Sequence, residues 1–177
     1  MHPHIEHVLR DLGPELFGWM MSSLGSETEA GDAFSLFAEE LWKSLARYDG
    51  RCSMRTWCYM LARHTVARAR AARANERLVP IGEGRFSEVA AEVRETTLRH
   101  LRTDAKDRVR ALREQLDPDD RELLVLRVDK DLGWRDIALV MLGEGTSDEA
   151  LTRHAAVLRK RFERVKKQLR ARYGVIG

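Results

Sequence analysis

The sequence predicts an all-α fold with two small helical domains, an N-terminal helical bundle and a C-terminal helix-turn-helix, joined by a partly helical linker. Apolar residues recur at helical spacing, β-branched runs are short, and no Asn-Gly hairpin signal occurs. The 177 residues suit one domain or two small ones, and an apolar content of 44% is enough to build a core. We expect domains over 4–73 and 108–177, with the linker over 74–107.

The N-terminal half carries three helical segments. The first is expected over about 5–24, with a break at Gly13-Pro14 because both residues disfavour helix interiors. The stretch GSETEAGD interrupts the pattern, and a second helix follows over 33–48. After the turn DGRCS, a long helix is predicted over 54–74.

The linker is predicted from helix-breaking residues in the stretch NERLVPIGEGRF, which contains Pro80, Gly82 and Gly84. The helical pattern resumes over 87–116, where Ser87 is a suitable N-cap.

The second half carries sharper start and stop signals. Asp117 and Pro118 are typical of an N-cap and a first helical position. Gly133 is expected to cap the next helix and Gly143 to end it. Thr146 then stands at capping-box spacing for the last helix.

The last two helices are typical of a helix-turn-helix, because a short capped helix, WRDIALVML, is followed by a glycine-bearing turn and a longer basic helix. The second helix of that motif enters the major groove, where Arg binds guanine and other cations neutralise phosphates. A plain helical hairpin is the alternative, and the turn is longer than the usual three or four residues. One apolar stripe runs along the last helix through Leu151, Ala155, Leu158, Phe162, Val165 and Leu169.

Charge is unevenly distributed along the chain. The 31 Lys and Arg and the 28 Asp and Glu leave a net charge of only +3. Acidic residues dominate 27–42, whereas basic residues dominate 47–73 and 153–172. Two separated basic zones, each beside another nucleic-acid signal, favour nucleic-acid binding over plain solvated helix surface.

Several classes of protein are disfavoured by composition. No apolar run is long enough to span a membrane, and the N-terminus lacks the features of a secretory signal. Two cysteines do not make a disulfide framework. We therefore expect a soluble protein of the cytoplasm with reduced thiols.

The stretch RCSMRTWCYMLARH holds Cys52, Cys58 and His64 at equal spacing. On a helix, six residues rotate a side chain by about 120° and raise it by about 9 Å, so Cys58 and His64 diverge. No other cysteine can complete a tetrahedral metal site. We expect no metal or redox site here, and Cys58 is expected to be a small buried hydrophobe.

The aromatic and basic residues of the same stretch resemble a platform for single-stranded nucleic acid, on which bases stack while Arg follows the backbone. The alternative is that the aromatic residues belong to the core. For Tyr59 and Met60 the core interpretation has at least equal weight. For Trp57, which lies beside Arg55 and Thr56, we favour a functional role.

The two halves together resemble an extracytoplasmic-function sigma factor, the smallest type in the sigma-70 family of bacterial RNA polymerase. The stretch EAGDAFSLFAEELWKSLARYDGRCSMRTWCYMLARH is similar to the second conserved region of these factors. The stretches LDPDDRELLVLRVDKDLGWRDIALVMLG and LRKRFERVKKQLR are similar to the fourth. This chain departs from the family at Ser35 and Leu36, where Gln-Glu is common, and at His64, where Asn is usual.

The resemblance implies a factor without catalysis or cofactor that binds core RNA polymerase, directs it to promoters and helps to melt them. The residues that would dock on the β′ clamp helices are Asp32, Leu36, Glu39, Glu40 and Trp42. Those that would hold the −10 element as a single strand are Arg47, Tyr48, Arg51, Arg55, Trp57, Arg63 and His64. Those that would read the −35 element as duplex are Arg153, His154, Arg159, Lys160, Arg161 and Arg164.

The remaining parts of the resemblance concern partners. The linker near 74–100 would thread toward the active-site channel, the β flap would be a second polymerase contact, and an anti-sigma factor is a further partner that the family allows.

Two other classes of protein are alternatives. An ordinary helix-turn-helix regulator with an N-terminal sensor or dimerisation domain is the first alternative, but a duplex reader needs no single-strand platform. An enzyme is the second, and we find no nucleophile elbow, P-loop, HExxH or paired acid dyad. His2, His4 and His7 are interpreted as an incidental surface cluster.

Overall fold

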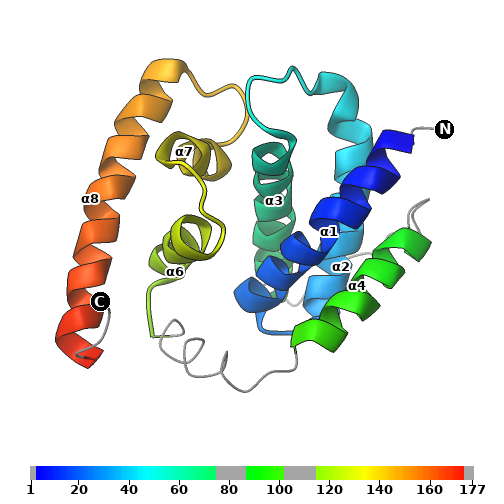
Figure 1. Cartoon of the computed structure of the whole chain (residues 1–177), viewed down its shortest axis with the longest axis horizontal. Coiled ribbons are helices and arrows are strands. Elements are labelled where there is room, and N and C mark those ends of the chain that lie inside the picture. The colour runs from blue at the N-terminus through cyan, green and yellow to red at the C-terminus, as the bar shows by residue number, and fades with distance from the viewer. Residues whose placement is uncertain (1–2, 75–86, 102–114, 174–177) are drawn as a thin grey trace. The chain divides into compact units, whose positions relative to one another are not determined.

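The computed structural model describes residues 3–74, 87–101 and 115–173, and these ranges are helical with no strand (Figure 1). The all-α prediction is confirmed. The chain divides into two compact units, Met1–Asp104 and Ala105–Gly177.

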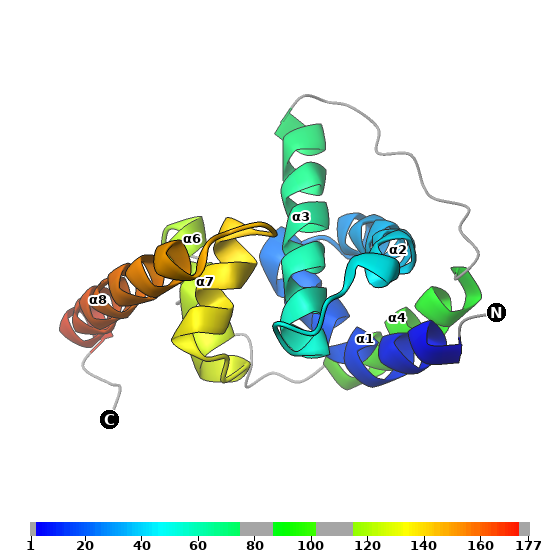
Figure 2. The same cartoon turned by 90° about the horizontal axis from the view of Figure 1, so that it is seen from above.

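The first unit is a bundle in which one helix packs against three others. α1 (Pro3–Leu24) contacts α2 (Glu27–Ser44), α3 (Met54–Ala74) and α4 (Ser87–Leu101), and a short 3-10 turn, η1 (Leu45–Arg47), follows α2. Figures 1 and 2 both place α4 alongside α1. The largest core side chains are Phe17, Trp19, Phe34, Phe37 and Tyr59.

The helix break predicted at Gly13-Pro14 is wrong, because α1 runs through both residues. Proline removes one backbone hydrogen bond and strains the preceding turn, but α1 is held by packing on three neighbouring helices. Gly13 serves that packing, since a Cβ at this position would lie 2.9 Å from Cγ1 of Val93 on α4. Tertiary burial therefore outweighs local propensity here.

The stretch GSETEAGD does not interrupt the helical pattern for long. α2 begins at Glu27, where Ser26 is the N-cap and its hydroxyl accepts a 3.3 Å hydrogen bond from the Glu29 backbone N–H. Gly25 has a φ of +71°, which allows the chain to turn tightly from α1 into α2. The acidic residues expected in a loop thus form the first turn of a helix, where the helix dipole favours them.

Part of the predicted linker belongs to the first unit. Residues 75–86 and 102–114 lie outside the described ranges, but α4 buries Ala90, Val93 and Thr97. Arg94 donates to the Gly31 carbonyl on α2 at 3.2 Å. The linker boundaries remain a prediction, and within them α4 is a docked helix.

The second unit consists of α6 (Pro118–Leu124), which continues into the π-helical turn η2 (Val125–Asp129), then α7 (Trp134–Leu142) and α8 (Asp148–Tyr173). The start at Asp117 is confirmed, because its carboxylate accepts a 3.0 Å hydrogen bond from the Asp119 N–H. The limits of α7 at Gly133 and Gly143 are also confirmed.

The N-cap predicted for α8 is off by one residue. Ser147 accepts a 3.3 Å hydrogen bond from the Ala150 N–H, whereas the Thr146 hydroxyl donates to the Gly143 carbonyl at 2.8 Å. Thr146 therefore closes the turn after α7 instead of starting α8. The predicted apolar stripe of α8 faces the core, with Leu151, Leu158 and three further members buried. None of the helices in the described ranges has the length and apolar character needed to cross a membrane.

Candidate nucleic-acid interface

The turn between η1 and α3 is held in shape by its aromatic residue. The Tyr48 hydroxyl donates to the Cys52 carbonyl at 2.6 Å, and its ring lies edge-on to Trp57 with centroids 5.6 Å apart. Burial, followed by nearby Cys52, Cys58 and Asp49, raises the pKa of the Tyr48 hydroxyl. Gly50 supplies the positive φ that the turn needs.

The end of this turn caps α3. The Ser53 hydroxyl accepts a 3.0 Å hydrogen bond from the Thr56 N–H and lies 2.9 Å from the Thr56 hydroxyl. A serine hydroxyl that accepts from the backbone N–H three residues later is a typical helix N-cap. The turn therefore has fixed ends, which hold Arg51 on its exposed side.

Trp57 does not provide the exposed stacking surface that the sequence suggested. Its side chain is 6% exposed, and its indole N–H is buried with no hydrogen-bond partner among the described residues. Residues 56–62 of α3 are all buried, because α1 and α2 both pack on this half of the helix. Tyr59 and Met60 are fully buried, as the core interpretation held.

Arg55 is engaged within the protein. Its guanidinium forms a two-point ion pair with Glu15 of α1, and Nε lies 3.2 Å from Oε2. The Tyr59 hydroxyl donates to the same carboxylate at 2.8 Å, and Arg55 lies over the Tyr59 ring. Arg55 is thus a structural cation in this conformation, with about a third of its side chain exposed.

The segregation of charge along the sequence has a structural cause in the first unit. Arg68 of α3 pairs with Glu40 of α2 at 3.3 Å, and Arg73 pairs with Glu29 at 3.6 Å. The acidic zone of α2 and the basic zone of α3 therefore neutralise each other along adjacent helices. Such exposed pairs contribute about 0–1 kcal/mol each, so phosphate can compete for the arginines.

Arg51 is paired with a residue of its own turn, two positions earlier in the sequence. Its backbone N–H and its Nε both donate to Asp49, at 3.1 and 2.7 Å. These hydrogen bonds, the backbone one first, lower the pKa of the Asp49 carboxyl. The predicted single-strand residues thus differ in access: exposed are Arg47, Arg51 and His64; half-buried are Tyr48, Arg55 and Arg63; buried is Trp57.

The predicted polymerase-docking residues lie on α2. Trp42 is 40% exposed, unusual for so large an apolar side chain, whereas Leu36 is buried. Asp32, Glu39 and Glu40 are half-buried, and Glu40 is the partner of Arg68. The accessible part of the predicted set is therefore Trp42, together with the partly exposed carboxylates of Asp32, Glu39 and Glu40.

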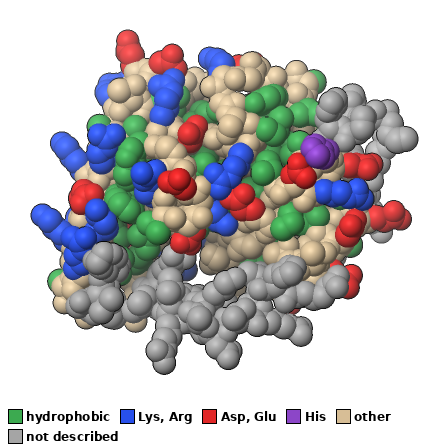
Figure 3. Space-filling view, in the orientation of Figure 1, with side chains coloured by type: hydrophobic (Ala, Val, Ile, Leu, Met, Phe, Trp, Pro, Cys, Tyr) green, Lys and Arg blue, Asp and Glu red, His purple; other side chains and the backbone are tan. Residues whose placement is uncertain are grey.

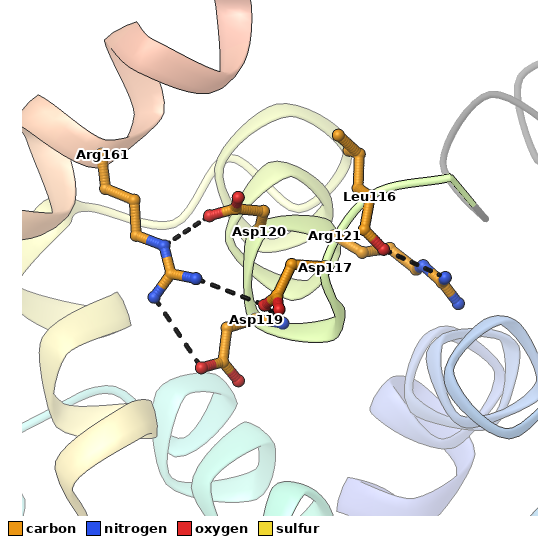
Figure 4. Close-up of polar contacts among 6 residues, drawn as sticks. All are labelled: Leu116, Asp117, Asp119, Asp120, Arg121 and Arg161. Carbon is orange, nitrogen blue, oxygen red and sulfur yellow. Dashed lines mark hydrogen bonds and ion pairs between the residues drawn. The ribbon is translucent and has the colours of Figure 1, made fainter. Parts of the chain in front are cut away.

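In the second unit, Arg161 is held by three carboxylates at the start of α6 (Figure 4). It pairs with Asp117 at 3.4 Å, Asp119 at 3.7 Å and, more closely, Asp120. Burial opposes the charge on Arg161, but the hydrogen bond and ion pairs with these carboxylates outweigh it and raise its pKa. Arg161 therefore points toward α6 and does not belong to the outer face of α8.

Arg159 flanks the other side of α8. It lies over the Trp134 ring at 5.9 Å, and Arg127 lies over the same ring at 5.0 Å. Trp134 in turn packs edge-on against Phe162. Two arginines of the predicted duplex-reading set are thus anchors for α8.

The outer face of α8 lies opposite its apolar stripe and is basic. Figure 3 shows Lys and Arg side chains gathered along this helix at the left of the view. No carboxylate of the described residues pairs with Arg153, Lys160, Arg164 or Lys167, all of them exposed, while His154 is half-buried. The outer face also contains Ala156 and Val157. Lys167 and Val157 lie outside the predicted duplex-reading set, although helical rotation from the buried stripe places them on this face.

The two cysteines are free, and Cys58 is fully buried. Burial, with a smaller contribution from Cys52, raises the pKa of the Cys58 thiol to about 12. Within the described ranges, no group of three His, Cys, Asp or Glu side chains could hold a metal ion. The sulfur atoms of the stretch RCSMRTWCYMLARH therefore pack in the bundle at Cys58 and border the turn at Cys52.

Part of the first unit is similar to a known protein family. Residues 8–76 match Sigma-70 region 2. The matched range contains most of α1, all of α2 and α3, and the turn between them. A search of curated proteins and of solved structures found no match to the chain.

Proposed function

We propose that the chain is a member of the sigma-70 family, whose members are non-enzymatic factors that bring RNA polymerase to promoters, and that it is a sigma factor of the extracytoplasmic-function type acting in the cytoplasm. The observation that carries the proposal is the region 2 match over α1, α2 and α3.

The first step of the proposed mechanism is docking on core RNA polymerase. α2 presents the exposed Trp42, with the partly exposed Glu39 one helical turn before it. An exposed aromatic ring rimmed by polar groups is the usual composition of a protein–protein hot spot. We assign it to the clamp helices of the β′ subunit, with the second unit at the β flap.

The second step is capture of the −10 element as a single strand. The fixed turn presents Arg51, Arg47 is exposed at the end of η1, and His64 is exposed on α3. Among the described residues, the ion-pair partner of Arg51 is the exposed Asp49, so a phosphate can replace that carboxylate at little cost. Trp57 is buried in this conformation, and any stacking of a base on it requires the Tyr48 ring to move aside.

The third step is reading of the −35 element by α8. Arg153, Lys160 and Arg164 on the outer face supply the charge that binds duplex phosphates or guanine edges. Arg159 and Arg161 hold the helix in place. The linker would join the unit that binds the −10 element to the unit that reads the −35 element. An anti-sigma factor would act by covering the binding surface of either unit.

The proposal is tested by transcription with core RNA polymerase on a pool of genomic promoter fragments. We expect run-off transcripts that core polymerase alone does not make. A Trp42→Ala variant should lose polymerase binding, while Leu142→Ala, which changes an equally exposed apolar residue on α7, should keep it. Transcription no greater than that of core polymerase alone contradicts the proposal.

The same experiment separates a sigma factor from an ordinary helix-turn-helix regulator. A regulator binds duplex promoter DNA without polymerase and does not open it. Permanganate reactivity of thymines measures opening directly. We expect Arg47→Gln with Arg51→Gln to reduce it, and Arg73→Gln, at the far end of α3, to leave it unchanged.

A further inference from the structure

The outer face of α8 carries one apolar side chain between its cations. Arg153, Val157, Lys160 and Arg164 follow each other at steps of four, three and four, so they lie along one face of the helix. The apolar stripe that includes Leu158 and Phe162 is buried on the opposite face. Val157 is 56% exposed, the highest exposure of a large apolar residue among the described residues, shared only by Val128 on η2.

The rotation of α8 at this point is fixed by contacts on both flanks. Two residues after Val157, Arg159 lies over Trp134, and four residues after it, Arg161 is held by the carboxylates of α6. Because both anchors fall within about one helical turn of Val157, its methyl groups are presented in one direction, along with the side chains of Arg153 and Lys160.

The chemistry of this face fits the major groove. Its cations suit phosphates and guanine edges, and the only apolar group that the major groove offers is the C5-methyl of thymine. A branched aliphatic side chain between cations therefore has one natural contact in duplex DNA. We propose that Val157 reads a thymine methyl in the duplex that binds the outer face of α8, and so sets base preference at one position of the site. This inference rests on the proposed function of α8.

The test begins with selection of duplexes from a randomised pool by the full chain assembled with core RNA polymerase. Three forms are compared: wild type, Val157→Ala and Val128→Ala. Alanine is a better helix former than valine, so Val157→Ala keeps α8 folded. We expect the wild type and Val128→Ala to select a T·A pair at one shared position, and Val157→Ala to lose that preference alone.

The selected duplex then provides the sharper measurement. Replacing that thymine by deoxyuridine removes only the methyl group, and we expect affinity for the wild type to fall about fourfold, the value of one buried methyl. Val157→Ala should bind the two duplexes equally. If Val157→Ala keeps the preference, or if deoxyuridine has no effect on the wild type, the inference is overturned while duplex reading by α8 stands. If no form enriches any duplex, the proposed function of α8 fails together with the inference.

Discussion

Arg55 of α3 and Glu15 of α1 are joined by a two-point ion pair, forty residues apart in sequence. The Tyr59 hydroxyl donates to the same carboxylate, so one acidic side chain of α1 fixes two side chains of α3. The pair lies in the first turn and a half of α3, directly after the turn that presents Arg51. The rigidity of the candidate −10 surface therefore depends on a residue in α1.

Glu15→Gln should lower the free energy of unfolding by about 1–2 kcal/mol, because Arg55 would keep its charge and lose a bidentate partner that is only about a quarter exposed. Glu39→Gln is the matched control, since Glu39 is equally buried but its ion-pair partner within the described part of the chain is the exposed Lys43, at 3.7 Å. Urea unfolding measures both. Equal losses for the two variants would mean that the Arg55 pair has no special role.

Trp57→Ala should destabilise the first unit by about 3–5 kcal/mol, because it removes a buried ring that packs on Tyr48. Trp57→Phe should cost clearly less, since it keeps an aromatic ring and removes a buried N–H that has no partner. Urea unfolding again gives the values. If Trp57→Ala costs almost nothing, the ring is accessible in solution and is free to stack on a base.

The fold was predictable wherever local signals decide the structure. Asp117, Gly133 and Gly143 define helix ends through hydrogen bonds and φ values that depend on a few neighbouring residues, and the sequence located all three. The helix break predicted at Gly13 and Pro14 is wrong because the low helix propensity of these residues is a local property. The stabilisation that keeps the helix intact there comes from packing against α4, which the local sequence does not show.

The candidate site was predicted less well, for the same reason. Basic residues are visible in a sequence, but their partners are not. Arg55 and Arg161 bind carboxylates forty or more residues away, which removes them from the exposed basic surface. The apolar stripe of α8 also predicts which side chains face away from the core. That orientation alone places Arg164 on the outer face and Arg161 on the side of the helix.

Cys52 and Cys58 should differ in reactivity toward thiol reagents. The pKa of the Cys58 thiol is raised to about 12, so at a pH of about 8 almost none of it is the reactive thiolate, and the side chain is fully buried as well. Cys52 is half-buried in the turn. Mass spectrometry after iodoacetamide treatment should find one label on the folded protein, at Cys52, and two labels after unfolding in urea. Rapid labelling of Cys58 in the folded protein would contradict its position in the core.

Arg161→Gln and Arg164→Gln should affect different properties, although the residues lie on the same helix. Arg161→Gln leaves three carboxylates without their cation and should lower the stability of the second unit by about 1–3 kcal/mol. Arg164→Gln should leave stability unchanged and reduce the salt dependence of duplex binding by about one unit of slope. Thermal unfolding and binding at several salt concentrations measure the two effects. A reversed pattern would place Arg161 at the DNA and Arg164 in the fold.

Gly13→Ala tests the docking of α4 on α1, because the sign of its effect on the free energy of unfolding depends on whether α4 is packed there. In an open helix position, Gly→Ala stabilises by up to about 1 kcal/mol. At Gly13 the new Cβ would lie 2.9 Å from Val93 Cγ1 and 3.2 Å from Phe34 Cζ, so we expect a net loss of about 1 kcal/mol or more. Gly18→Ala is the control within the same helix, because nothing lies within 4 Å of its Cβ, and it should be stabilising.

Adding Val93→Ala should relieve the clash at Gly13, so the two substitutions together should cost less than the sum of their separate effects. Stabilisation by Gly13→Ala as large as that by Gly18→Ala would mean that α4 does not pack on α1 in solution.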